Sequence, residues 1–232
     1  MNRMNRLYGA ALTLLALALL VALGPFAPAA EERKAEPAAA GWTPLFNGKD
    51  LAGWKPTGTA IWSVDDGCLV GTQTDGKGGD LYTEKSYDNF ELRVTYRVVW
   101  PANSGIWFRD QYQFDILKYA NPVAYSGTLY CPGKMFIFAN LDESLENRDG
   151  WNEAQIYANG DRIILWLNGK KTGECQDKSF AKGRFGIQVH PGNEMKGMKI
   201  ILKRIDVRPL KQGDKPSDPI TPPKASASKA GK

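Results

Sequence analysis

The chain has 232 residues, with 30 Lys and Arg residues against 25 Asp and Glu residues and a single histidine. Residues 1–40 hold four basic and three acidic residues and residues 211–232 hold five and two, which leaves 21 basic and 20 acidic residues between them. The basic excess therefore belongs mainly to the two ends, and the middle of the chain lacks the positive charge that a nucleic-acid surface requires. We exclude nucleic acid as a partner on this ground.

The first 30 residues have the pattern of an export signal. Arg3 and Arg6 precede the apolar run 8–23, and Ala27-Pro28-Ala29 supplies small residues at a cleavage position. The alternative is an uncleaved membrane anchor, but the run is shorter than the roughly 20 residues that a membrane span needs. We therefore predict a signal peptide at 1–30, a periplasmic or secreted protein, and no stable membrane insertion after cleavage.

Two further segments are too poor in large apolar residues to form a core. Residues 31–40 are rich in Ala, Glu and Pro, and residues 211–232 repeat Lys, Ser, Ala and Pro. Such a composition cannot offset the entropy that folding costs. We therefore predict a disordered linker at 31–40, one domain at 41–210 and a disordered basic tail at 211–232.

The three cysteines, Cys68, Cys131 and Cys175, lie far apart and show no Cys-x-x-Cys spacing. This spacing gives no support for a zinc site. In an exported protein two of them could form a disulfide; equally, all three could be small buried apolar residues. Both interpretations are open.

Short segments rich in β-branched and aromatic residues, separated by Gly, Asn and Asp, predict an almost entirely β domain. The expected strands are 62–64, 68–71, 81–83, 90–99, 105–109, 112–118, 134–138, 151–158, 162–167, 170–175, 185–190 and 198–207. Asp65-Asp66-Gly67, Asn159-Gly160 and Asn168-Gly169 are typical of tight hairpin turns, because Asn, Asp and Gly tolerate a positive φ. Only residues 142–147 favour a short helix.

About ten to twelve antiparallel strands in one domain require two stacked sheets, since a single open sheet of that width would leave one face bare. We therefore predict an all-β fold, a two-sheet antiparallel jelly-roll sandwich. A β-propeller is disfavoured because the chain has no internal repeat.

Three of the expected strands place polar side chains opposite an apolar face. Their apolar residues recur at every second position, so the two-residue period directs the residues between them to the other face. These opposite residues are Trp107 and Arg109 on the first strand, Gln113 and Asp115 on the second, and Gln188 and His190 on the third. Arg93 and Arg97, from the expected strand 90–99, are further candidates for the same binding surface.

An aromatic ring, two amides, a carboxylate, an imidazole and a cation on one rigid sheet suit a hydroxyl-rich ligand. We therefore predict a carbohydrate site. Each residue also has a structural alternative: Asp115 could pair with Arg109, the glutamines could be solvated, and His190 could be an ordinary turn residue. The concentration of these groups on one face favours the ligand site.

Five phrases occur in a characteristic order and spacing across residues 41–210. They are LFNGKDLAGW at 45–54, NSGIWFR at 103–109, YQFDI at 112–116, WNE at 151–153 and IQVH at 187–190. So arranged, they resemble the 3-keto-disaccharide hydrolase family, also described as 3-keto-glucoside-1,2-lyase/3-keto-2-hydroxy-glucal hydratase domains. The resemblance implies a concanavalin-like, laminin-G-like jelly roll, exported by bacteria, that cleaves glycosides already oxidised at C3.

The reaction that the resemblance implies begins at C2, because a ketone at C3 makes the hydrogen on C2 acidic. Asp115 or His190 would remove this proton, with Arg109 or a bound divalent cation at the enolate oxygen. The C1 substituent would then leave and water would add back. Trp107, Gln113 and Gln188 would position the ring, and no redox cofactor is required because another enzyme would install the ketone.

Two other classes of function fit the same surface. One is a non-catalytic carbohydrate-binding module, and the other is an adhesion domain without a small ligand, since a fold does not determine a function. A binding module would hold a 3-keto-disaccharide intact, whereas the enzyme would release a reducing sugar or a 2-hydroxy-glycal.

Overall fold

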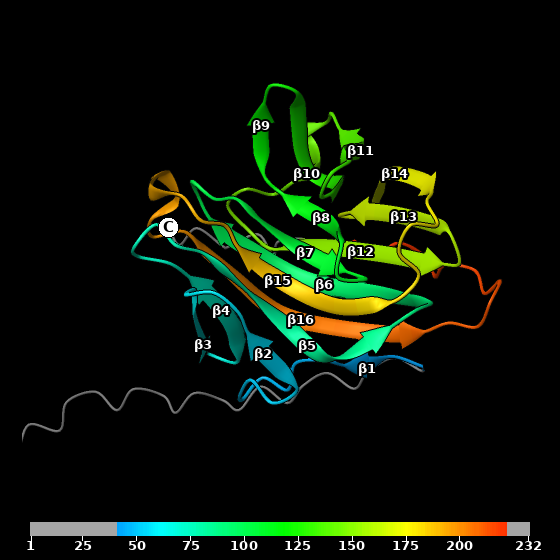
Figure 1. Cartoon of the computed structure of the whole chain (residues 1–232), viewed down its shortest axis with the longest axis horizontal. Helices are drawn as coiled ribbons and strands as arrows, with labels where there is room; N and C mark the ends of the chain where they lie inside the picture. Colours follow the sequence, from blue (N-terminus) through cyan, green and yellow to red (C-terminus); the bar gives the residue numbers. More distant parts are fainter. Residues whose placement is uncertain (1–40, 222–232) are drawn as a thin grey trace, which may run out of the picture. The chain divides into compact units, whose positions relative to one another are not determined.

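Residues 41–221 are described by a computed structural model of the chain, and in them sixteen strands form two antiparallel sheets (Figure 1). The predicted signal peptide and linker at 1–30 and 31–40, and the end of the predicted tail at 222–232, lie outside the described residues. Both helices found between 41 and 221 are three-residue 3₁₀ turns, and neither is long enough to cross a bilayer. One of them, Glu143–Leu145, is what remains of the helix predicted at 142–147.

Sheet A has eight strands in the order β14-β13-β12-β6-β16-β4-β3, with β1 paired to β16. These strands are β1 (Thr43–Pro44), β3 (Ile61–Asp65), β4 (Cys68–Thr72), β6 (Phe90–Val99), β12 (Asn152–Asn159), β13 (Arg162–Leu167), β14 (Lys170–Gln176) and β16 (Lys199–Pro209). Its two longest strands, β6 and β16, are far apart in sequence and pair along most of their length.

Sheet B has eight strands in the order β11-β10-β8-β7-β15-β5-β2, with β9 paired to β10. These strands are β2 (Trp54–Pro56), β5 (Gly79–Tyr87), β7 (Ser104–Phe108), β8 (Tyr112–Ile116), β9 (Lys118–Ala120), β10 (Val123–Cys131), β11 (Met135–Asn140) and β15 (Gly183–Val189). Figure 1 shows β9 and the adjoining part of β10 projecting beyond the rest of the sheet.

The hydrophobic core lies between the two sheets and is formed by every second residue of the long strands. On β6 of sheet A, Leu92 and Val94 are fully buried. On sheet B, the side chains of Ile106, Phe114 and Ile187 are at most 1 % exposed. The predicted alternation and the predicted two-sheet sandwich are both confirmed, because each sheet buries one face against the other.

The phrase LFNGKDLAGW at 45–54 builds a turn and a core anchor. The Asn47 side-chain oxygen accepts hydrogen bonds from two backbone N–H groups that follow it in the chain. Trp54 then enters the core, 5 % exposed, and its indole N–H donates to the Leu45 carbonyl at 2.8 Å. The most specific phrase of the sequence therefore serves the fold.

Two predicted hairpin turns are confirmed and a third is displaced by one residue. The Asp66-Gly67 and Asn168-Gly169 turns have a positive φ at both residues, as a type I′ turn requires. At the third hairpin, Asn159 still pairs with Arg162 in the ladder. The turn there is 160–161, because Asn159 itself belongs to the strand.

The predicted disordered tail begins too early. Residues 211–221 are described, and they lie along β12 of sheet A: the Tyr157 hydroxyl donates to the Asp214 carbonyl at 2.6 Å, and the Asn159 amide donates to the Lys211 carbonyl at 2.9 Å. The segment is polar, but side chains of another strand satisfy its backbone, which composition cannot reveal. The ordered domain therefore extends beyond residue 210.

Glu91, on β6, is the buried group to which this segment attaches. Its carboxylate is fully buried and accepts hydrogen bonds from the Arg208 guanidinium, the Gln155 amide, and the backbone N–H and hydroxyl of Ser217. Removing one member of a buried network leaves charged and polar groups without partners, which costs far more than breaking an exposed pair.

We expect Glu91→Ala to lower the free energy of unfolding by about 3–5 kcal/mol, the range found for broken buried ion pairs. The same change should open residues 211–221 to trypsin. Denaturant unfolding and limited proteolysis measure the two effects. Glu84→Ala is the matched control, because Glu84 makes only an exposed pair with Lys55, and it should cost less than about 1 kcal/mol. Equal unfolding free energies in the two variants would contradict this role of Glu91.

Candidate functional site

Two rows of side chains cross the outer face of sheet B, because residues paired in register on neighbouring strands share a face. The first row contains Asp80 on β5, Gln188 on β15, Gly105 on β7 and Asp115 on β8. The second row contains Tyr82, Gly186, Trp107, Gln113, Tyr130 and Phe136, on β5, β15, β7, β8, β10 and β11. The rows thus combine polar groups with a line of aromatic rings.

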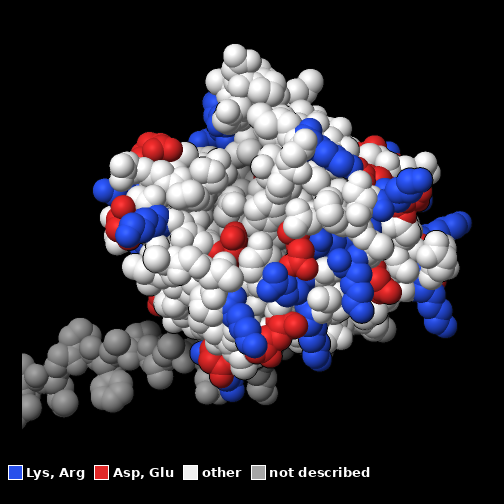
Figure 2. All heavy atoms as spheres, in the orientation of Figure 1, with Lys and Arg blue, Asp and Glu red and all other residues white. Residues whose placement is uncertain are grey.

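Glycines in both rows make room for the side chains beside them. A Cβ atom on Gly105 would lie 2.4 Å from the Gln113 carboxamide carbon, and one on Gly186 would lie 2.6 Å from the Tyr82 ring. Both contacts are too short for any other residue, so the neighbouring side chains lie across the glycine backbone. Figure 2 shows a hollow on this face, below the projecting β9–β10 hairpin, lined mostly by residues other than Lys, Arg, Asp and Glu.

Asp115 and Gln113 are two buried polar residues of β8 that lack partners. Each is 3 % exposed. Among residues 41–221 nothing forms a hydrogen bond or ion pair with the Asp115 carboxylate, and the Gln113 side-chain nitrogen is likewise unpaired. Burial raises the pKa of Asp115 well above its ordinary value. Unpaired buried groups are costly in a fold and are expected at sites that act on a ligand.

Trp107 is held in place by a carboxylate. Its indole N–H donates to Asp80 Oδ1 at 2.8 Å, and the ring is 8 % exposed. Burial raises the pKa of Asp80, against the opposing effects of the Trp107 hydrogen bond and of nearby His190. The arrangement fixes the orientation of the indole and places a carboxylate beside an imidazole.

His190 follows the last residue of β15, next to Asp80. Its Nδ1 contacts the Pro191 carbonyl, which can only accept, and this contact favours the tautomer that carries the hydrogen on Nδ1. The other nitrogen, Nε2, is therefore left to act on a ligand as an acceptor, or as a donor once the ring is protonated. Gln188, half-buried, lies between Asp80 and Gly105 in the register.

Four of the predicted site residues are thus brought to one face: Trp107, Gln113, Asp115 and Gln188. His190 follows the end of β15 and is near enough to Asp80 to lower its pKa. The backs of the same strands carry the core residues, as expected. Their convergence depends on β15 lying between β5 and β7.

Arg109 is not part of this face, and its predicted place beside Asp115 is wrong. Strand β7 ends at Phe108, and Arg109 has a φ of 51°, so the strand alternation no longer directs its side chain. The guanidinium turns inward, 1 % exposed, and donates to the backbone carbonyls of Asp88, Gly160 and Phe180 at 2.7–3.1 Å. All three of its nitrogens are engaged, so Arg109 joins three loops and lies off the candidate face.

Arg93 and Arg97 also lie elsewhere, because their strand β6 belongs to sheet A. Arg93 stacks over Trp42 at 4.1 Å and donates to the Ser217 hydroxyl at 2.7 Å. Arg97 lies over Trp151 at 5.2 Å. Both face away from the core of sheet A, so their predicted place on the same surface as Trp107 and Asp115 is wrong.

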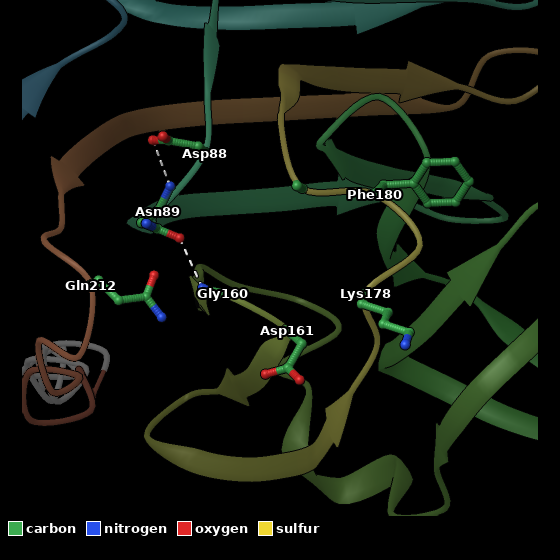
Figure 3. A pocket seen from close by; sticks show the side chains of 8 residues that line it. Asp88, Asn89, Gly160, Asp161, Lys178, Phe180 and Gln212 are labelled. Atoms are coloured by element: carbon green, nitrogen blue, oxygen red, sulfur yellow. Dashed lines mark hydrogen bonds between the residues drawn. The ribbon is translucent and has the colours of Figure 1, made fainter.

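A separate cavity of about 270 Å³ lies at the end of the sandwich where the Arg109 guanidinium binds three loops (Figure 3). It is lined by the β5–β6 turn, the β12–β13 turn and part of the loop after β14. Asp88, Gly160 and Phe180, whose carbonyls bind Arg109, are among its lining residues. Asn89 bridges two of these turns by accepting from the Gly160 N–H at 2.8 Å. Three backbone carbonyls of the lining and the Asn89 side chain are thus used by the fold.

Sequence reasoning missed four residues of the outer face: Asp80, Tyr82, Tyr130 and Phe136. The first two alternate with the buried residues Leu81 and Thr83. The expected strand began at 81, so extending the alternation back by one residue would have found Asp80. Tyr130 gave no such signal, because its strand was expected to be part of a long loop.

The structure bears on the predicted disulfide more directly than on the predicted cation. Cys131 and Cys175 are free thiols, so they do not form a disulfide with each other. In the described part of the chain no three His, Cys, Asp or Glu side chains gather as a metal site. The divalent cation suggested by Asp115 and His190 stays a prediction, since two side chains do not complete a coordination set.

A 3-keto-disaccharide hydrolase of Bacteroides thetaiotaomicron is 35% identical over 81 residues, which are 31% of this chain and 28% of that protein. This match therefore spans under a third of its relative.

Two solved structures share the fold. A candidate glycosyl hydrolase from Parabacteroides distasonis superposes with a TM-score of 0.57 at 19% identity, covering 74% of this chain and 94% of the other. A Bacillus subtilis protein of unknown function with a galectin-like fold gives a TM-score of 0.54 at 14% identity, covering 77% and 99%. At these identities the likeness concerns the sandwich alone.

A family model covers almost the whole ordered domain. It describes the 3-keto-alpha-glucoside-1,2-lyase-like domain and matches residues 41–208. That range includes both sheets and every residue of the two rows on sheet B. The chain belongs to the 3-keto-alpha-glucoside-1,2-lyase-like family.

Proposed function

We propose that this chain is an exported enzyme that cleaves 3-keto-glycosides, 3-keto-disaccharides among them, by elimination and hydration. Three things support the proposal: the family to which the chain belongs, the name of its Bacteroides thetaiotaomicron relative, and the chemistry of the sheet B face. The export signal predicted at 1–30 supports the location.

Asp115 is the base that removes the proton on C2. A carboxylate is a weak base in water, but burial without a partner raises the pKa of Asp115 and so strengthens the ionised form as a base. A base whose pKa approaches the working pH combines a useful ionised fraction with a useful driving force. The electron pair of the C2–H bond moves toward C3 and places negative charge on the C3 oxygen.

Gln113 replaces Arg109 as the group that stabilises this oxygen. Its side-chain nitrogen is buried and has no partner within 41–221, so its N–H groups are free for an oxyanion. An oriented donor in a water-poor site stabilises developing charge more strongly than it would in water. The two residues on β8 thus supply the base and the oxyanion donor from adjacent positions on one face.

The remaining residues of the face hold the ring and complete proton transfer. Trp107, fixed by Asp80, offers an apolar surface to the sugar, and Gln188 offers an amide to its hydroxyls. His190, when protonated, donates from Nε2 to the leaving oxygen on C1. The enolate then collapses to a ketone, the C1–O bond breaks, and a C1–C2 double bond forms. Water adds its hydroxyl to C1 and a proton to C2, which completes net hydrolysis.

The single observation that carries this proposal is the 3 % exposed carboxylate of Asp115, which has no partner among residues 41–221 and shares a face with Trp107, Gln113 and Gln188. A carboxylate that served only the fold would be paired, as Glu91 is.

We expect Asp115→Asn to lower kcat on a 3-keto-glucoside by about 10²–10⁴-fold, the usual contribution of a positioned base. Product release followed by chromatography measures it. Asp65→Asn, an exposed position on sheet A, is the control and should keep wild-type activity.

The wild-type rate should rise with pH through a pKa above the ordinary range of Asp, because burial raises the pKa of Asp115. A fully active Asp115→Asn protein, or a wild type that cleaves no 3-keto-glycoside, would sink the assignment.

Ionisation of Asp115 should also lower the free energy of unfolding as the pH rises. A group with a raised folded-state pKa contributes its full stability only below its unfolded-state pKa, and the contribution is lost as pH rises through the folded-state value. Asp115→Asn should therefore match the wild type near about pH 4 and exceed it in unfolding free energy toward about pH 8. Denaturant unfolding across this range measures the difference, and a difference that is constant with pH would refute the argument.

A further inference from the structure

The aromatic row continues beyond the residues that the proposed reaction uses. Trp107 contacts Tyr130 with ring centroids 6.2 Å apart, Tyr130 contacts Phe136 at 6.5 Å, and Phe136 contacts Tyr119 at 6.1 Å. Each pair meets at 61–85°, so the rings alternate between face and edge. A continuous line of rings therefore leads from the candidate site toward the edge of sheet B.

The geometry of the sheet places this line on the same face as the site. Tyr130 pairs in register with Gln113 on one side and with Phe136 on the other. Tyr119 comes from β9, in the hairpin that projects beyond the sheet in Figure 1, and it is 43 % exposed. From β7 to β11 there are three strand spacings, or roughly 14 Å. This length accommodates a second ring beside the one held at Trp107.

The chemistry of the line suits an uncharged ring. The phenol hydroxyls of Tyr119 and Tyr130 form no hydrogen bond with any described residue, so they are free to bind a ligand. The adjacent cation, Lys118, is engaged by Glu143 at 2.7 Å. Aromatic faces with free hydroxyls at their rims bind flat rings through C–H or π contacts and accept polar substituents at the periphery.

The row of aromatic rings also adjoins Asp115, the proposed base. Burial raises the pKa of Tyr130, and the neighbouring Asp115 carboxylate adds to the effect. A ring over Tyr130 would therefore lie beside the atoms on which Asp115 acts, on the side away from Gln188.

We propose that Tyr119, Tyr130 and Phe136 form a leaving-group subsite that selects glycosides whose C1 substituent carries an uncharged six-membered ring. The inference rests on the proposed function and extends it to substrate class. A second sugar and an aryl group share the ring face that these residues recognise, and the experiment separates them. Each residue here is a specificity residue and does not touch the reacting atoms.

The test compares kcat/KM for a 3-keto-disaccharide, phenyl 3-keto-glucoside and methyl 3-keto-glucoside. Phe136→Ala should lower the value for one or both ring-bearing substrates by about 3–10-fold, as expected for a lost aromatic contact. The methyl glycoside should change less than about twofold, because it has no ring to place there. A loss confined to the disaccharide assigns the subsite to a sugar, and a loss confined to the phenyl glycoside assigns it to an aryl group.

Two control variants sharpen the result. Phe136→Leu keeps apolar volume without a ring, so it should resemble Phe136→Ala, and Ile61→Ala, on the other sheet and 50 % exposed, should change nothing. An equal loss on all three substrates, or no loss on any, overturns the subsite.

A failure of the proposed function would be recognised separately. If the wild type cleaves none of the three, calorimetric binding of phenyl glucoside and of the unoxidised disaccharide is compared in wild type and Phe136→Ala. Weaker binding in the variant would uphold the subsite without the reaction, and equal or undetectable binding in both would overturn it.

Discussion

The antiparallel register of β5, β15, β7 and β8 is the constraint on which the candidate site depends. Each of these strands buries one face in the core, and this burial leaves no freedom in the direction of the other side chains. Register then aligns Asp80, Gln188 and Asp115 across the sheet through pairings between segments far apart in the sequence. A shift by one residue would send every polar group into the core, so the fold that is stable is also the fold that assembles the site.

The two sheets treat buried carboxylates in opposite ways. On sheet A, Glu91 and Glu153 are buried, and both are fully engaged, Glu153 by Thr95 at 2.9 Å and Arg204 at 3.0 Å. On sheet B, Asp115 is as deeply buried and has no partner among residues 41–221. An unpaired buried carboxylate is costly, and this cost on sheet B is the reason that the proposed mechanism assigns the base to Asp115.

Arg109 is a buried cation that stabilises the fold through backbone carbonyls and has no carboxylate partner among residues 41–221. Its guanidinium binds three backbone carbonyls, from the β5–β6 turn, the β12–β13 turn and the loop after β14. Carbonyl dipoles satisfy the planar set of N–H donors and tie three connections together at one end of the sandwich. In the proposed mechanism the oxyanion role passes to a neutral amide, Gln113, which brings no positive charge that would lower the pKa of Asp115.

The sequence alone determined which side chains within the strands β7, β8 and β15 face inward and which face outward, and four of the candidate residues lie on the face that it predicted. Alternation of apolar residues is a local property, so it predicted Trp107, Gln113, Asp115 and Gln188 without knowledge of neighbouring strands. Only the tertiary structure decided that Arg93 belongs to the other sheet, that Arg109 turns inward and that residues 211–221 pack along β12. Each of these depends on contacts between distant segments: strand order, the end of a strand at a turn, and backbone groups that find partners on another element.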